Sequence, residues 1–298
     1  MSLPRACGPL RLGGREFPVG RSLVMAVINR TPDSFYAGAR QYDVEVAAEA
    51  VARAEAEGAD LVDIGGVKAG PGDEVDVTEE LRRVVPFLSR IRSAHPGLLL
   101  SVDTWRAEVA AQACAAGANL INDTWAGHDP ALAEVAAVKD AGLVCSHTGG
   151  ARPRTRPHRV SYGDSPDGVL DDVLAGLAGS ARRATEAGVP PESLLLDPTH
   201  DFGKNTWHGL TLLRHTEALV ALGYPVLMSL SRKDFIGETL DLPVDARLEG
   251  TLAATAVAAW CGAKVFRAHD VAATRQVIDM VASIRGERPP ARAVRGLA

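Results

Sequence analysis

The chain has 298 residues, of which 46% are hydrophobic and 23% charged, an ordinary balance for a folded globular protein. Its 32 basic and 37 acidic residues give a net charge of -5, which excludes a general nucleic-acid binder, because such proteins carry a basic excess. No apolar stretch approaches the ~18 residues of a membrane span, and the four cysteines are widely spaced, as expected for reduced thiols in a cytoplasmic protein.

The predicted elements alternate between short apolar strands and longer helices. In chain order the candidate strands are residues 23–29, 60–64, 98–103, 119–123, 143–147, 194–197, 226–231 and 264–269. Apolar residues between them recur at helical spacing. Several of these helical segments end in a glycine that can close a helix: Gly58, Gly117, Gly142, Gly188, Gly223 and Gly262.

Eight strand–helix units in a chain of this length predict an α/β fold, a (β/α)8 TIM barrel in a single domain. An open doubly wound sheet is the alternative, and the absence of GxGxxG after the first strand argues against it. We place the barrel at residues 21–290, with an N-terminal lead-in at residues 1–20 and a C-terminal tail at residues 291–298.

Polar residues gather where the apolar strands stop. All strands of such a barrel run parallel, so these positions converge on the C-terminal face, where TIM barrels keep their sites. The residues at these positions are Asn29, Asp63, Asp103, Asn122, Asp123, His147, Asp197, Ser231, Lys233, Arg267 and His269. We therefore expect one polar cavity at that face.

The chemistry of this set predicts the kind of ligand. Asp103, Asn122 and Asp197 offer acceptors that suit a flat, nitrogen-rich heterocycle with N–H donors. Lys233 and Arg267 supply positive charge for a ring carbonyl or a phosphate. The sequence predicts a site for a heteroaromatic ring that carries an anionic group.

Other polar residues have simpler interpretations. Asp63 can bind ligand or only orient the backbone, Asp123 can cap a turn, and His147 can be a hydrogen-bonded residue at a strand end. His200, Asp201 and His208 suggest a metal, but their spacing matches no zinc pattern. Asp270 is expected to cap the last helix. The long segment GGARPRTRPHRVSYGDSPDG is either a solvated surface or a contact to pyrophosphate or a partner.

Several segments carry a family resemblance. The runs INRTPDSF, DIGG, SVDTWRAEVA, NDTW, LLLDPTHDFGKN, SRKDFIG and FRAHDV resemble the signature segments of dihydropteroate synthase, in the order of that family. The resemblance spans the chain from about Leu23 to the last helix and implies a (β/α)8 barrel of folate synthesis. It extends to the divergent second copy of this synthase that some actinobacterial genomes carry.

The resemblance also implies the reaction and its participants. Such a protein condenses 6-hydroxymethyl-7,8-dihydropterin pyrophosphate with p-aminobenzoate by a dissociative route and works with Mg²⁺, usually as a homodimer. Carried over by motif, the catalytic residues are Asp33 in a closing loop, Lys233 and Arg267. The substrate-binding residues are Asp103, Asn122, Asp197, Phe202, Ser231, Lys233, Arg267 and His269, and Asn29 lies near the metal and the pyrophosphate.

The chain departs from the family pattern on the site face. Val67, Lys68, Ala69 and Gly70 stand where the family usually has glutamate, serine, threonine and arginine. Further changes are Arg30 for an apolar residue, Ser229 for glycine, and Thr199, His200 and Asp201 for glycine, a bulky apolar residue and glycine. The lost threonine and arginine help bind pyrophosphate in the family.

Two functions follow from this mixture. One is an active synthase with weakened turnover, in which Arg30 or Lys68 replaces the lost arginine. The other is a paralogue that binds a pterin without synthase turnover. A non-pterin ligand is a minority third interpretation, suggested by His200 and Asp201.

Overall fold

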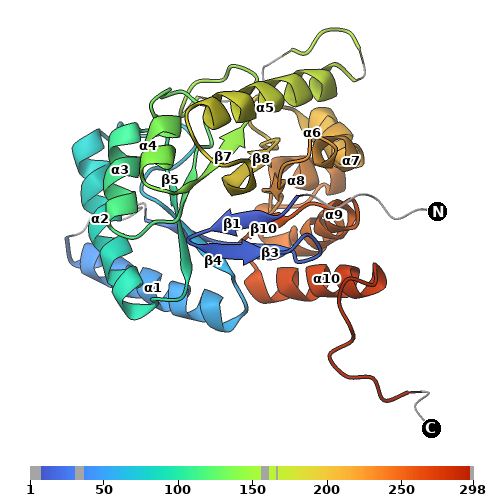
Figure 1. Cartoon of the computed structure of the whole chain (residues 1–298), viewed down its shortest axis with the longest axis horizontal. Coiled ribbons are helices and arrows are strands. Elements are labelled where there is room, and N and C mark those ends of the chain that lie inside the picture. Colours follow the sequence, from blue (N-terminus) through green and yellow to red (C-terminus); the bar gives the residue numbers. More distant parts are fainter. Residues whose placement is uncertain (1–7, 31–36, 156–160, 166, 296–298) are drawn as a thin grey trace.

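The computed structural model describes residues 8–30, 37–155, 161–165 and 167–295 of the chain. Strands occupy the centre of the molecule and helices surround them (Figure 1). Within the described part of the chain, no helix combines the length and apolarity needed to cross a membrane.

Eight parallel strands form the predicted barrel. They are β3 (Leu23–Asn29), β4 (Leu61–Gly65), β5 (Leu99–Asp103), β6 (Leu120–Asn122), β7 (Gly142–Ser146), β8 (Leu194–Asp197), β9 (Leu227–Met228) and β10 (Val265–Ala268). Their order in the sheet is β8-β7-β6-β5-β4-β3-β10-β9, and a parallel bridge between Leu196 and Val226 joins the two ends. The (β/α)8 fold is confirmed.

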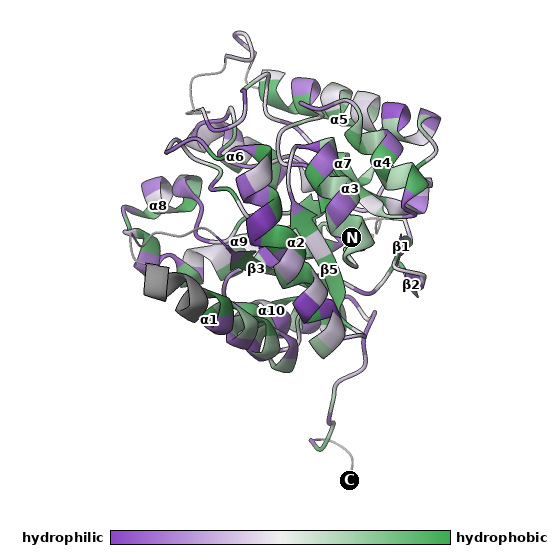
Figure 2. Cartoon of the chain, turned by 90° about the vertical axis from the view of Figure 1, so that its left-hand side faces the viewer, coloured by the Kyte–Doolittle hydropathy of each residue, from purple (hydrophilic) through white to green (hydrophobic). Residues whose placement is uncertain are grey.

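The helices lie outside the strands and cover them. They are α1 (Ala37–Ala56), α2 (Val77–Ala94), α3 (Ala107–Ala115), α4 (Leu132–Val138), α5 (Gly168–Glu186), α6 (Thr206–Arg214), α7 (Thr216–Val220), α8 (Asp234–Leu240), α9 (Leu248–Trp260) and α10 (Val271–Ile284). In Figure 2 the helices carry both purple and green residues. In α2, for example, Val84, Phe87, Leu88 and Ile91 are buried at helical spacing.

An N-terminal hairpin closes one end of the barrel. The strands β1 (Leu10–Leu12) and β2 (Arg15–Phe17) meet at Gly13 and Gly14, which have φ of 53° and 72°. The hairpin was not predicted from the sequence, where residues 1–20 were expected to be a lead-in. Its apolar side chains are buried in one cluster with the first inward residues of the barrel strands.

The barrel interior consists of two layers of opposite character. Side chains two residues apart on a strand point to the same side. The apolar layer beside the hairpin comprises Leu23, Met25, Leu61, Leu99, Leu120, Val144, Leu195, Leu227 and Val265. Two residues further along seven of the strands stand Asp63, Ser101, Asn122, Ser146, Asp197, Ser229 and Arg267. The interior therefore changes from apolar to polar within one strand repeat.

One predicted helix end was wrong. Five of the six glycines have a left-handed backbone, with φ from 88° to 110°, and end helical segments as expected. Gly142 instead begins β7, and Asp140, with φ 49°, takes the left-handed position. A Cβ on Gly142 would collide with Leu12 Cδ2, so this glycine allows close packing against the hairpin.

Candidate functional site

Asp63 is the centre of the polar layer. Its fully buried carboxylate accepts hydrogen bonds from Ser101 Oγ at 2.6 Å, Asn122 Nδ2 at 2.9 Å and Arg267 Nε at 2.7 Å. In these contacts Asp63 orients side chains rather than backbone amides. It fixes the direction of the Asn122 amide, whose Oδ1 is buried without a hydrogen-bond partner among the described residues.

Asp103 lies at the upper edge of this layer. Arg267 Nη2 donates to Asp103 Oδ2 at 3.2 Å, and Thr124 Oγ1 donates to Oδ1 at 3.2 Å. Burial raises the pKa of Asp103 to about 7, repulsion from Asp63 adds to the rise, and Arg267 opposes it. Sheet pairing sets Asn29, Gly65, Asp103 and Asn122 in one row across four neighbouring strands, so predicted site residues of β3, β5 and β6 meet.

Asp197 accepts hydrogen bonds from Thr199 and Ser229. Thr199 N donates to Oδ1 at 2.7 Å and Ser229 Oγ donates to Oδ2 at 2.9 Å. Burial raises the pKa of Asp197, and these hydrogen bonds together with Lys233 act against that rise. Each carboxylate oxygen already has one partner, so a ligand at Asp197 shares an acceptor with the protein.

Lys233 and Phe202 form the wall of a groove beside this layer. Lys233 Nζ donates to the carbonyl of His200 at 2.7 Å and lies 4.6 Å from the centre of the Phe202 ring. Trp125 meets the same ring edge-on at 5.1 Å. The groove has a volume of about 670 Å³, and Ser231 and His269 also line it.

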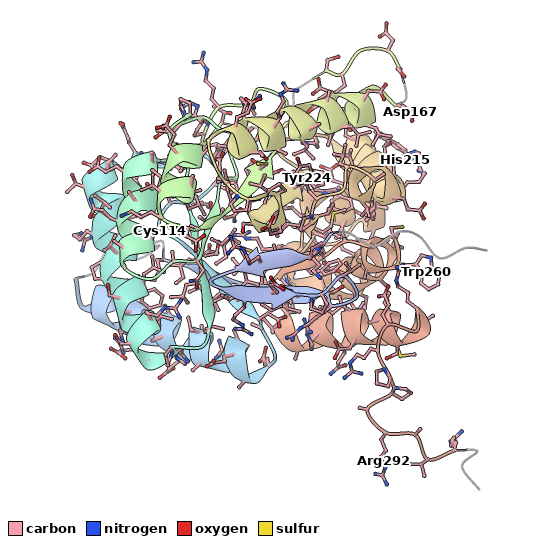
Figure 3. All side chains as sticks on the ribbon, in the orientation of Figure 1. Cys114, Asp167, His215, Tyr224, Trp260 and Arg292 are labelled. Atoms are coloured by element: carbon pink, nitrogen blue, oxygen red, sulfur yellow. The ribbon has the colours of Figure 1, made fainter. Side chains whose placement is uncertain are left out.

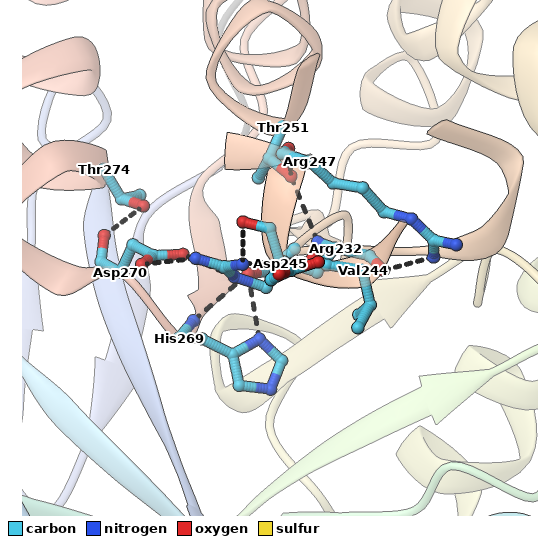
Figure 4. A network of polar contacts seen from close by, with 9 residues as sticks. Arg232, Val244, Asp245, Arg247, Thr251, His269, Asp270 and Thr274 are labelled. Carbon is cyan, nitrogen blue, oxygen red and sulfur yellow. Dashed lines mark hydrogen bonds and ion pairs between the residues drawn. The ribbon is translucent and has the colours of Figure 1, made fainter. Parts of the chain in front are cut away.

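Ser231 and His269 are held together at the ends of β9 and β10. Ser231 Oγ lies 2.9 Å from His269 Nδ1 and accepts from the His269 backbone N–H at 3.2 Å. Figure 4 shows His269 and the adjoining polar network around Arg232. Arg232 binds both carboxylate oxygens of Asp270 at 3.0 Å and the carbonyls of Val244 and Asp245. This guanidinium stabilises the segment after β9.

The structure brings most predicted residues to one face. Asp103, Asn122 and Arg267 contact Asp63 or one another. Burial lowers the pKa of Lys233, and the charges of Asp197 and Arg267 also act on this pKa. Asp33 lies outside the described residues. The binding and catalytic roles assigned to these residues stay predictions, whereas their convergence is a structural fact.

The predicted metal position has a single oxygen ligand. Asn29 is exposed at the end of β3. Within the described ranges, no group of three or more His, Cys, Asp or Glu side chains could hold an ion. Mg²⁺ is often bound by one or two protein oxygens together with substrate phosphates and water. Asn29 therefore fits Mg²⁺ only when a pyrophosphate completes its coordination.

Comparisons with known proteins assign the family. A sequence model of pterin binding enzymes matches residues 25–269. The chain belongs to this family. It is 62% identical to "Inactive dihydropteroate synthase 2" of Mycobacterium leprae over 96% of this chain and 99% of that one. It is 40% identical to the dihydropteroate synthase of Bacillus subtilis over 84% of each chain.

A solved structure gives the same result. The dihydropteroate synthase of Xanthomonas albilineans with 4-aminobenzoic acid matches with a TM-score of 0.83 and 38% identity, over 94% of this chain and 99% of that chain. The resemblance inferred from the motifs is confirmed. What distinguishes this member of the pterin-binding enzymes is found where its residues depart from the family pattern.

Two of the residues that differ from the family pattern have an unusual backbone conformation. Thr199 and Asp201 have φ of 51° and 69°, in the left-handed region that glycine tolerates best. The β-branched Thr199 is an outlier there, and such strain costs about 1–3 kcal/mol. Asp201 compensates by accepting hydrogen bonds from the N–H groups of Asp234 and Phe235 at the start of α8. The family glycines are thus replaced by residues that bind their surroundings.

The substitute arginine that the sequence suggested is directed elsewhere. The Arg30 guanidinium lies 4.9 Å from the centre of the Phe87 ring of α2. In the loop after β4, Lys68 is exposed, and a Cβ on Gly70 would meet no atom within 4 Å. This loop has room for the family arginine but offers only a lysine two positions away.

The simpler interpretations hold for several polar residues. Asp123 accepts from the N–H groups of Trp125 and Gly127 and orders a turn. His147 Nε2 lies 2.8 Å from Asp172, and burial lowers the pKa of His147 to about 4. The buried His200 packs against Phe235, with ring centres 5.3 Å apart. One interpretation was wrong: Asp270 lies directly before α10, but its side chain binds Arg232 and does not cap the helix.

Three contributors to the site were missed. Ser101 could have been found, because it lies between Leu99 and Asp103 on the inward side of β5. Thr124 gave no signal by itself. Lys204 is buried and donates to the carbonyls of His147 at 2.7 Å and Phe202 at 2.9 Å, so it holds the segments after β7 and β8 together.

Proposed function

We propose that this protein binds a pterin in the polar layer of its barrel and has lost synthase turnover. The observation that carries the proposal is the cluster of Asp103, Asn122 and Arg267 around the buried Asp63. The name of the Mycobacterium leprae relative supports this paralogue better than it supports an active synthase.

A pterin suits the acceptors of this layer. The ring presents N–H donors along one edge, and Asn122 Oδ1 is a buried acceptor without a partner among the described residues. Such an atom is costly to leave unpaired, so a ligand N–H that reaches it is bound favourably. Asp103 adds a carboxylate at the same level of the barrel.

The groove beside Phe202 suits a second aromatic group. Its volume of about 670 Å³ and the aromatic wall formed by Phe202 accept a ring the size of p-aminobenzoate. Lys233 lines the groove, and Arg267 lies in the polar layer. We assign them to the pyrophosphate and the ring oxygen, with Ser231 and His269 next to them.

Loss of turnover follows from the charges available to the leaving group. Pyrophosphate departs only if positive groups stabilise the charge that develops on it. Arg267 is held by Asp63 and Asp103, and Arg232 is held by Asp270. Gly70 supplies no side chain where the resemblance implies an arginine. Binding of the pterin ring uses different groups and survives these changes.

Magnesium enters this proposal only with a phosphate ligand. Asn29 would offer its amide oxygen to the ion, and pyrophosphate oxygens and water would provide the remaining ligands. The ion would supply positive charge to the pyrophosphate. Since the pterin ring contacts other residues, we expect pterin binding without pyrophosphate to be independent of Mg²⁺.

We also propose a homodimer in the cytoplasm. Helices α9 and α10 carry a shallow apolar groove of about 380 Å³, lined by Leu252, Ala256, Val277 and other residues. Met280 and Ile284 beside it are 61% and 60% exposed. Apolar patches of this kind mark association surfaces. In analytical ultracentrifugation we expect the native chain to sediment as a dimer and Met280→Lys to sediment as a monomer.

Two measurements test the function. Calorimetry with 7,8-dihydropterin should show binding, and a pteroate assay with the pterin pyrophosphate, p-aminobenzoate and Mg²⁺ should give no product above background. A second member of the family with synthase activity serves as the positive control. Sustained pteroate formation would show that the protein is an active synthase. Absence of pterin binding would reject the proposal.

A further inference from the structure

The loop between β4 and α2 has little structure of its own. Residues 66–76 include three glycines and one proline, and they contain no arginine and no aromatic residue. Glycine-rich segments lose much conformational entropy on ordering, so contacts from outside must hold such a loop in one place.

Three arginines from other parts of the chain hold its backbone. Arg83 Nη1 donates to the carbonyl of Gly66 at 2.9 Å, and Arg106 Nη2 donates to the carbonyl of Val75 at 2.7 Å. Arg154 Nη1 donates to the carbonyl of Asp73. All three acceptors are backbone carbonyl groups, so these contacts need no polar side chain in the loop.

Arg154 comes from the most distant element. It belongs to the segment after β7, which ends at Asp167 beside the start of α5 (Figure 3). In the sheet, β5 and β6 lie between β4 and β7. A contact between the segments that follow β4 and β7 therefore joins two loops whose strands are separated in the sheet by β5 and β6. Asp103 and Asn122 stand at the ends of β5 and β6.

The surroundings of Arg154 are shaped for this contact. Its backbone is left-handed, with φ 61°, and its Nε is buried without a hydrogen-bond partner among the described residues. A Cβ on Gly72 would lie 2.9 Å from Arg154 Nη2, a distance that forces the guanidinium to move. Gly72 is therefore the residue that lets the arginine approach the loop.

We propose that Arg154 is a positioning residue that straps the loop after β4 across the Asp103 side of the barrel mouth and slows ligand exchange there. The nature of the ligand rests on the proposed function. The strap itself is a property of the ligand-free protein and is tested separately from pterin binding.

Glycine variants provide a matched test. Gly70 and Gly72 lie in the same loop, and the backbone of neither is left-handed, so alanine fits both backbones without strain. Gly72→Ala crowds Arg154, whereas Gly70→Ala meets nothing within 4 Å. The two variants change composition equally and differ only in their effect on the strap.

Trypsin reports on the loop directly, because Lys68 is exposed within it. Cleavage after Lys68, measured by mass spectrometry and normalised to the urea-unfolded chain, should rise about tenfold in Arg154→Ala, which corresponds to the loss of one charged hydrogen bond. In Gly72→Ala it should rise by a smaller factor, because the flexible end of Arg154 shifts away from the added Cβ but keeps its charge. Gly70→Ala should match the native chain. Arg154→Lys, which keeps a charged donor, should restore part of the protection.

Ligand exchange is measured next. Stopped-flow fluorescence with a pterin should show faster association and faster dissociation in Arg154→Ala and Gly72→Ala, with a smaller change in Kd. Equal cleavage in all four variants would overturn the strap. Increased cleavage with unchanged pterin rates would overturn its control of exchange. Increased cleavage with no pterin binding by the native chain would instead reject the proposed function.

Discussion

The polar layer and the loops above it are held by opposite means. In the layer, side chains from different strands bind one another, as Ser101, Asn122 and Arg267 do around Asp63. In the loop after β4, distant arginines bind backbone carbonyls. A change of residue in the layer removes a hydrogen-bond partner, whereas a change in the loop removes no acceptor, although added bulk at Gly72 crowds Arg154. The loop can therefore lose chemistry while the layer keeps its ligand site.

The largest effect that separates the two regions is on stability. Asp63→Ala leaves Arg267 without its buried partner and should lower the free energy of unfolding by about 3–5 kcal/mol. Urea unfolding followed by circular dichroism measures this. Ser101→Ala removes one neutral donor to the same carboxylate and should cost only about 0.5–1.5 kcal/mol. Equal losses in the two variants would contradict the central role of Asp63.

The next effect is on ligand affinity. Asp103→Asn keeps the shape of the side chain but removes a charged acceptor that contributes about 1.5–3 kcal/mol. Pterin affinity measured by calorimetry should fall by a corresponding factor, with little change in the unfolding midpoint. Lys68→Ala, in the loop, is the control and should bind the pterin as the native chain does. Unchanged affinity in Asp103→Asn would remove this residue from the site.

The pH dependence sharpens the same assignment. Since burial raises the pKa of Asp103 to about 7, its ionised form predominates only above that value. Ligand N–H groups bind the ionised carboxylate, so pterin affinity should be highest above pH 8 or so and decline as the pH falls through about 7. Calorimetry between pH 5.5 and 8.5, roughly, should show this decline in the native chain and a flatter profile in Asp103→Asn.

The smallest effect is expected at the loop. Ala69→Thr combined with Gly70→Arg restores the residues that the family resemblance implies, and open space beside Gly70 accepts the larger side chain. Pteroate formation should rise above the background level that the native chain gives, because a charged donor again faces the leaving group. Gly70→Gln, with similar bulk and no charge, is the control. A rise in both variants would show that charge is not the missing element.

The sequence specified the strands and their polar ends because these follow a local pattern. The predicted limits of β3 and β8 agree with the structure, and the residues at the ends of β5, β6 and β10 converge as expected. β9 is shorter than predicted, since it stops at Met228 and the following segment turns at Arg232, with φ 56°. Its last residues serve the site rather than the sheet.

Other features depend on contacts that no local pattern reveals. The short runs LRL and REF on either side of Gly-Gly in LRLGGREF are a hairpin signal that could have been used at β1 and β2. The contact of Arg154 with the carbonyl of Asp73 joins residues 81 positions apart, and no sequence pattern in either segment predicts it. The three-way binding of Asp63 likewise requires the barrel to be closed.

The hairpin at the other end of the barrel has a consequence for anything bound within. Leu10, Leu12 and Phe17 close the lower end of the barrel, so the interior opens at one end only. A molecule that enters must leave by the path it came, past whatever spans the rim. Shortening the chain to begin after Phe17 would expose the apolar layer of the barrel to water at that end, while its packed side chains would still separate Asp63 from the solvent below.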